Sequence, residues 1–193
     1  MAFGQAFGQE EFQIPGLGSS FEYALARLDT KCNDMGGSMQ LCRRVYSRFG
    51  RLRGKMVDIG RSKVQELVVF AIGNAVKDFR RLVRKQFEKP LLFRLATAQK
   101  VIDELRRIHF LLDDIYKTLQ LTDDPTMTEW QEHWDSDREL QASWFVTKFK
   151  ETRLREVINQ IKGPQGLDDA LAQLKFALEI RDRDTNILPK LRE

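Results

Sequence analysis

The chain has 193 residues, of which 42% are hydrophobic and 31% charged, and its formal net charge is +4 at pH 7; this balance is typical of a soluble helical protein. The chain has only two Cys and two His, which nearly excludes a structural zinc site, because such a site typically needs four Cys or His ligands, and excludes a disulfide-rich scaffold. No apolar run reaches the roughly 18 residues of a transmembrane helix, and no Lys or Arg precedes Arg27, which argues against a secretory signal.

Residues 1–18 differ in composition from the rest of the chain. They contain a tandem Ala-Phe-Gly-Gln repeat and a Pro, which disfavour a stable helix. We expect a flexible Phe/Gly-rich leader that docks weakly on the following domain. The alternative is a detachable segment that meets a membrane or a partner through its apolar side chains, which are Phe3, Phe7, Phe12 and Ile14.

A first helix is expected from Ser19 or Ser20, either of which can act as its N-cap, up to the break at Gly36-Gly37. The second helix then starts at Ser38. Its apolar residues recur in steps of three and four, which predicts a seam packed against other helices. These residues are Cys42, Val45, Phe49, Leu52 and Met56. We expect Cys42 to pack as a small hydrophobic side chain, with both cysteines as reduced thiols.

Ser62 and Gln65 form a candidate capping box for a third helix. Its apolar positions are Val64, Leu67, Val68, Ala71, Ala75, Phe79, Leu82 and Val83. A fourth helix should begin at Pro90 and run uninterrupted to the stop signal at residues 123–125. Short loops favour antiparallel neighbours, so the pattern over residues 19–121 predicts an antiparallel four-helix bundle.

A second capping-box candidate, Thr128 with Gln131, introduces a long fifth helix. It should end at the Gly-Pro-Gln-Gly stop over 163–166, and a short amphipathic helix with Leu167, Leu171, Leu174 and Leu178 should follow. The predicted fold is therefore all-α, with the bundle followed by one long and one short brace helix over 122–188. Residues 189–193 read as a tail or linker.

No catalytic, metal-ligating or cofactor-binding motif is recognisable. Neither His109 nor His133 has a Cys nearby in the sequence, and both are interpreted as surface or interface side chains. We therefore expect no catalytic residues, no metal and no cofactor, and predict that the chain is not an enzyme.

Basic residues are concentrated in one part of the chain. Residues 43–94 contain 15 Lys or Arg against 4 Asp or Glu, an excess of 11, whereas the segments before and after carry net charges of −3 and −4. The basic stretch could be a solvated face neutralised by the acidic later helices, or it could bind an anionic membrane surface. Nucleic acid is the third choice and an unlikely partner, because no nucleic-acid-binding motif or interleaved aromatic series accompanies the charge.

Two short motifs carry a family resemblance. Residues 31–35, Lys-Cys-Asn-Asp-Met, and residues 41–48, Leu-Cys-Arg-Arg-Val-Tyr-Ser-Arg, resemble the first two helices in the bundle of the mixed lineage kinase domain-like family. Residues 95–100 resemble that family's fourth helix. Residues 129–138 look like the segment that follows the bundle in helical leader domains of tyrosine-kinase-like kinases, including oomycete ones.

This resemblance implies a non-enzymatic signalling module, cytoplasmic with peripheral recruitment to membranes. As in cell-death executioner bundles, it would self-associate on activation and bind anionic phospholipid membranes, which it would permeabilise. The resemblance also implies a kinase or pseudokinase domain as a partner, in cis or in trans. The alternative is a regulatory adaptor or oligomerisation module of a kinase-type protein, without membrane activity.

The lipid-binding hypothesis selects basic residues on the second and third helices as contacts to phosphate. They are Arg43, Arg44, Arg48, Arg51, Arg80, Arg81, Arg84 and Lys85, of which the first three match the family's basic motif. Trp130 and Trp134 are the candidate interaction residues, either as exposed interface anchors or, more simply, as core packing of the brace. A third hypothesis is release of the brace by phosphorylation or by a partner.

Overall fold

A computed structural model describes residues 18–59 and 66–151, together with the single residues 166, 168 and 171. Every regular element in this part of the chain is helical, which confirms the all-α prediction. In chain order the helices are α1 (Gly18–Asn33), the short 3-10 helix η1 (Gly36–Ser38), α2 (Met39–Ile59), α3 (Glu66–Phe87), α4 (Leu91–Ala96), α5 (Ala98–Thr118), α6 (Thr126–Glu132) and α7 (Trp134–Glu151).

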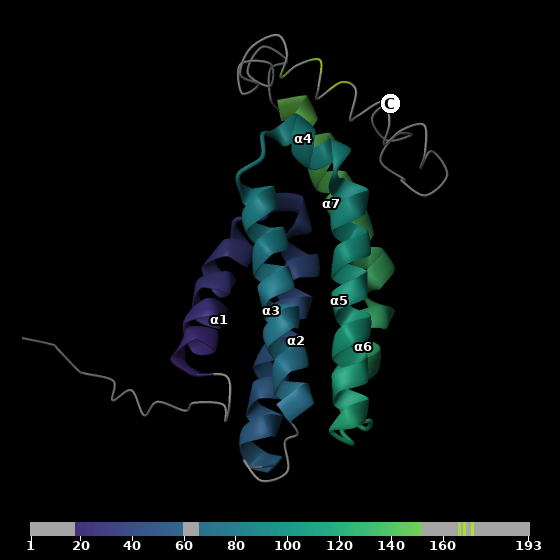
Figure 1. Cartoon of the computed structure of the whole chain (residues 1–193). Coiled ribbons are helices and arrows are strands. Elements are labelled where there is room, and N and C mark those ends of the chain that lie inside the picture. The colour runs from purple at the N-terminus through teal and green to yellow at the C-terminus, as the bar shows by residue number, and fades with distance from the viewer. Residues whose placement is uncertain (1–17, 60–65, 152–165, 167, 169–170, 172–193) are drawn as a thin grey trace, which may run out of the picture.

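Four long helices surround the main core. α1 packs against α2 and α3, and α5 packs against the same two helices. Successive members of this set run in alternating directions (Figure 1). α6 packs against α5, and α7 packs against α2, η1 and α6.

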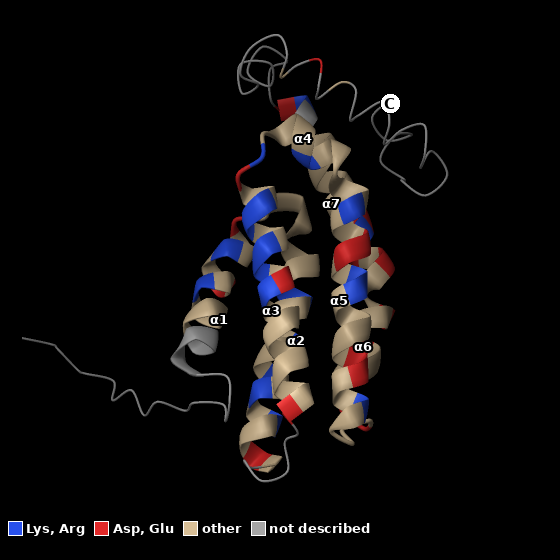
Figure 2. Ribbon diagram, in the orientation of Figure 1, with Lys and Arg blue, Asp and Glu red and all other residues tan. Residues whose placement is uncertain are grey.

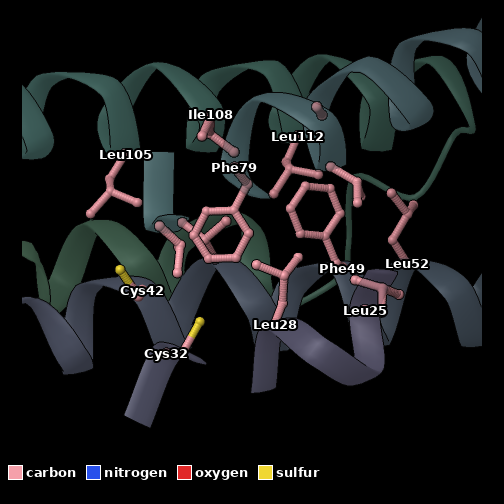
Figure 3. Packing of buried hydrophobic residues seen from close by; sticks show 14 of the residues in the cluster. Leu25, Leu28, Cys32, Cys42, Phe49, Leu52, Phe79, Leu105, Ile108 and Leu112 are labelled. Atoms are coloured by element: carbon pink, nitrogen blue, oxygen red, sulfur yellow. The ribbon is translucent and has the colours of Figure 1, made fainter. Parts of the chain in front are cut away.

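The core is built from the predicted apolar seams. All five apolar seam residues of α2 are at most 1% exposed. Phe49 of α2 meets Phe79 of α3 with the ring centroids 6.0 Å apart. Leu28 of α1 and Leu112 of α5 lie beside these rings (Figure 3). Side chains from all four long helices therefore form one continuous apolar cluster.

The two cysteines lie in this cluster, one on α1 and one on α2 (Figure 3). Both Cys32 and Cys42 are free and fully buried. Contact with the Cys32 side chain, together with burial, raises the pKa of the Cys42 thiol well above its usual value. Cys42 is therefore a packed, unreactive thiol, as the sequence predicts.

α7 packs against the glycine turn that connects α1 to α2. Gly36 has a positive φ of 57°, and a Cβ at this position would lie 2.5 Å from the ring of Trp144. Beside this contact, Gln141 of α7 donates a hydrogen bond from its side-chain amide to the Ser38 hydroxyl, at 2.7 Å. Only glycine satisfies both the backbone conformation and the close approach of the indole.

Several predicted helix boundaries are wrong. Ser19 and Ser20 lie inside α1, which begins at Gly18, so neither is its N-cap. The fourth helix is not continuous, because it is divided at Thr97 into α4 and α5. The Thr97 hydroxyl donates to the Phe93 carbonyl at 2.7 Å, a local bond of the kind that bends helices.

The predicted fifth helix is also divided, at His133, into α6 and α7. Thr128 lies within α6 and is not its N-cap. Instead, the Asp124 carboxylate accepts hydrogen bonds from the backbone N–H and the hydroxyl of Thr126, at 3.0 and 2.6 Å. An aspartate before the helix therefore satisfies one of the first backbone N–H groups of α6, and the predicted capping box is not what starts this helix.

Some predictions fall outside the described residues. They are the leader up to residue 17, the Ser62–Gln65 capping box, the stop over 163–165, nearly all of the short amphipathic helix, and the tail over 189–193.

Candidate functional site

Arginines of α2 face acidic residues of the later helices. Arg44 forms an ion pair with the buried Asp137 of α7, with its Nη2 atom 3.2 Å from Oδ1. Arg51 lies 3.5 Å from the carboxylate of Glu129 on α6. These contacts support the alternative in which acidic later helices neutralise part of the basic stretch.

Arg48 is buried inside this interface and is only 2% exposed. Its guanidinium is paired with Asp113 of α5 and lies within hydrogen-bonding distance of His109, 3.1 Å from Nδ1 and 3.0 Å from the carbonyl oxygen. A buried charge requires such partners, because burial removes its hydration. The prediction that Arg48 contacts lipid phosphate is therefore wrong for this conformation, since its side chain is enclosed by protein.

His109 is stacked against Trp130, with parallel rings and centroids 4.5 Å apart. Trp134 meets the same imidazole edge-on at 5.8 Å. Burial, with smaller contributions from Arg48 and Arg44, lowers the pKa of His109 to about 3. The imidazole is therefore neutral at pH 7, with Nδ1 accepting from Arg48 and the proton on Nε2. His109 is a core residue, contrary to its interpretation as a surface or interface side chain.

Trp130 and Trp134 are 3% and 5% exposed. Their indoles are 5.6 Å apart and perpendicular. Both join the main apolar cluster. In this conformation they fix α6 and α7 to α5, so the simpler alternative, core packing, holds and they are not exposed anchors for a partner.

The remaining predicted basic residues lie on the surface. Arg43 is exposed on α2, where its Nε donates to the side-chain oxygen of Asn33 at 2.7 Å. The cations predicted on α3 are also exposed, and Figure 2 shows them close together on this helix. They are Arg80, Arg81, Arg84 and Lys85. Exposure leaves these α3 side chains able to reach an external anion.

Exposed residues on α3 follow one helical face, with successive steps of three or four positions. We define this outer face of α3 as Leu67, Phe70, Asn74, Lys77, Arg81 and Arg84, with Arg80 beside it. Leu67 and Phe70 are 78% and 70% exposed. The sequence pattern grouped Leu67 with the apolar positions of this helix, although its side chain is exposed, and it did not single out Phe70 or Lys77 as part of a surface.

The outer face of α3 therefore changes character along its length. The apolar pair occupies the first turns of the helix, and the cations follow over the next turns, about 26 Å from first residue to last at 1.5 Å per residue. Asp78 is the carboxylate next to these cations, and it is paired with Arg107 at 2.9 Å and Arg81 at 3.6 Å. Among the described residues, no ion-pair partner is recorded for Lys77, Arg80 or Arg84.

Comparison of the chain with protein-family models, with curated proteins and with solved structures gives no significant match. Within the described ranges, no helix is both long enough and apolar enough to span a bilayer. No group of three or more His, Cys, Asp or Glu in those ranges could hold a metal ion.

Proposed function

We propose that the chain is a non-enzymatic signalling module that binds anionic membrane through the outer face of α3 and self-associates there on activation. In this proposal α1, α2, α3 and α5 form a four-helix bundle, and α6 and α7 act as its brace. The observation that carries the proposal is the exposed α3 face, which combines cations with two unburied apolar side chains.

The cations supply the attraction to the membrane. Lys77, Arg80 and Arg84 are exposed and have no recorded carboxylate partner among the described residues. Each basic residue near an anionic leaflet contributes about 1 kcal/mol, screened beyond a Debye length. Together the three contribute roughly 3 kcal/mol, or about two orders of magnitude in the binding constant.

The two exposed apolar side chains would insert into the membrane interface. Leu67 and Phe70 lie on the same face as Lys77 and Arg84. A helix that places both kinds of residue on one side can lie in the interface, with apolar side chains among the acyl chains and cations at the phosphates. The resemblance to cell-death bundles leads to the same proposal from the sequence.

Vesicle flotation tests this assignment. The full chain should float with phosphatidylcholine vesicles that contain phosphatidylserine and not with pure phosphatidylcholine, and moderate salt should weaken the binding. Replacing Lys77, Arg80 and Arg84 by Gln should weaken binding roughly a hundredfold. The matched control replaces Lys117, Lys148 and Lys150 by Gln, which removes the same charge from exposed or half-exposed sites on α5 and α7.

Equal loss of binding in the two triple variants would mean that only net charge matters, and the assignment to α3 would fail. The change of Leu67 and Phe70 to Ser tests insertion separately, because it keeps the charge. It should reduce binding at moderate salt more than at low salt, where attraction by the cations dominates. Crosslinking on the vesicles should show oligomers that the free chain does not form.

The adaptor function is the second candidate, because exposed Leu67 and Phe70 could equally bind a protein. A folded chain that binds no anionic vesicle, yet forms oligomers that the change of Leu67 and Phe70 to Ser abolishes, would favour the adaptor.

A further inference from the structure

A groove of about 740 Å³ lies where α3 packs against α5, beside the outer face of α3. Its lining includes five cations and two carboxylates, which leaves an excess of three positive charges. The charged residues are Arg81, Lys85, Lys89, Lys100 and Arg107, with Asp78 and Glu104.

Both carboxylates of the groove are already engaged. Arg107 forms ion pairs with Asp78 at 2.9 Å and with Glu104 at 3.0 Å. Arg81 adds a contact to Asp78 at 3.6 Å. The arginines and carboxylates therefore largely neutralise one another, and the excess charge belongs to the three lysines.

Lys85, Lys89 and Lys100 come together from the C-terminal end of α3, the turn after it and the first turn of α5. Burial, followed by the charges of Lys100 and Lys85, lowers the pKa of Lys89, because both neighbouring ammonium groups repel its charged form. Among the described residues, no carboxylate is recorded in an ion pair with any of the three. A bound anion would relieve this repulsion.

Polar side chains hold Lys89 in position. Its ammonium donates to the Thr97 hydroxyl at 3.1 Å. That hydroxyl donates in turn to the Phe93 carbonyl and accepts from the side-chain amide of Gln86 at 3.2 Å. Gln86 is itself buried, so this part of the groove is fixed before any ligand arrives.

We infer that this groove binds a small polyphosphate group, with Lys85, Lys89 and Lys100 as the donors to phosphate oxygens. Ammonium groups are strong, charge-assisted donors to phosphate. The volume lies within the usual range of small-ligand sites, about 300–1,000 Å³. The lining residues recorded for the groove include no aromatic ring on which a base could stack, so the recognised part is the phosphate.

This inference goes beyond the proposed membrane function, because the ligand can be either a soluble polyphosphate or a phosphate-bearing lipid headgroup. The probe is sodium tripolyphosphate, titrated into the full chain by calorimetry at low salt. The wild-type chain should bind it with one-to-one stoichiometry. Replacing Lys85, Lys89 and Lys100 by Gln should weaken binding about fivefold per ammonium group, and roughly a hundredfold together.

Two matched variants test the location. The change of Lys77, Arg80 and Arg84 to Gln, and the change of Lys117, Lys148 and Lys150 to Gln, each remove three cations outside the groove and should alter tripolyphosphate binding far less. Circular dichroism verifies that each variant is folded, and the single change Lys100→Gln, at an exposed residue, provides a milder test with the same direction. Absence of tripolyphosphate binding by the folded wild-type chain, or equal weakening in all three triple variants, would overturn the inference.

Charge-matched vesicles that contain phosphatidic acid or phosphatidylserine identify the source of the phosphate. A preference for the phosphomonoester lipid that disappears on replacing Lys85, Lys89 and Lys100 supports the site and assigns it to a headgroup. Unchanged vesicle binding by that variant, together with weakened tripolyphosphate binding, supports the site and assigns it to a soluble ligand. Because vesicle binding through Lys77, Arg80 and Arg84 is measured separately, this inference and the proposed function can fail independently.

Discussion

Lowering the pH from about 7 to about 4 should destabilise the folded chain through His109. In the folded state the pKa of this imidazole is about 3, because it is buried and faces Arg48 and Arg44. In the unfolded state it returns to about 6.5. Below pH 6.5 the unfolded chain therefore binds a proton that the folded chain excludes, so stability is lost as the pH falls towards 3.

The size of the effect follows from the two pKa values. Between pH 7 and pH 4 the loss of unfolding free energy assigned to His109 is roughly 3 kcal/mol, at about 1.4 kcal/mol per pH unit below the unfolded pKa. A loss of this size is a large fraction of the stability of an ordinary domain, about 5–15 kcal/mol. Protonation would also place a second cation beside the guanidinium of Arg48, 3.1 Å away.

Urea unfolding followed by tryptophan fluorescence at each pH measures the free energy. His109→Asn keeps an acceptor for Arg48 and removes the titration, so it should destabilise the chain at pH 7 by loss of the stack on Trp130. Its disadvantage relative to the wild type should then shrink by roughly 3 kcal/mol at pH 4. The control is His133→Asn, at the exposed histidine. A difference between the wild type and His109→Asn that stays constant with pH would refute the reasoning.

Three further substitutions should change the free energy of unfolding, two of them lowering it and one raising it. Gly36→Ala should lower the unfolding free energy by about 1–3 kcal/mol, because its backbone has a positive φ and its Cβ would meet Trp144. Gly50→Ala should raise it by about 0.5–1 kcal/mol, since nothing lies within 4 Å of the added Cβ and the helix gains propensity; thermal unfolding checks both. Trp130→Ala should lower the free energy of unfolding, measured in urea, by about 3–5 kcal/mol, because it removes the buried indole that stacks on His109. A variant that stayed as stable as the wild type and lost only self-association would contradict core packing.

Apolar periodicity predicted the long helices and most of their buried residues. It succeeded for α2, where the heptad positions from Cys42 to Met56 are all buried. It failed at Thr97 and His133, because the apolar spacing continues across both breaks. The Thr97 break depends on a side-chain hydrogen bond, which periodicity does not report.

The packing of α7 could not be predicted from apolar periodicity, for a different reason. Its buried face includes Asp137 and Gln141, each held by a partner on a distant part of the chain. A helix that buries polar residues shows no clean apolar stripe, so its packing partners cannot be read from hydrophobic pattern alone. The partners Arg44 and Ser38 lie 93 and 103 residues away in sequence.

The sequence does contain a signal for the buried ion pair between Arg48 and Asp113. Arg48 falls three residues after Val45 and four before Leu52, which places it on the apolar face of α2. Asp113 lies four residues after His109 and three before Tyr116, on the buried side of α5. Opposite charges on two apolar faces indicate a buried pair, because neither charge is tolerated there alone.

The fold therefore divides one basic stretch of sequence into two parts with different roles. On α2, Arg44, Arg48 and Arg51 are paired with carboxylates of α7, α5 and α6, and so stabilise the packing of later helices. On α3, the cations of the outer face have few such partners and are exposed. Net charge by segment could not distinguish these parts, since the neutralising carboxylates are more than 60 residues away in sequence. The contacts also imply a coupling: any event that lifts α6 and α7 from α2 would separate Arg44 and Arg51 from their carboxylate partners and strengthen the attraction of this surface for anions.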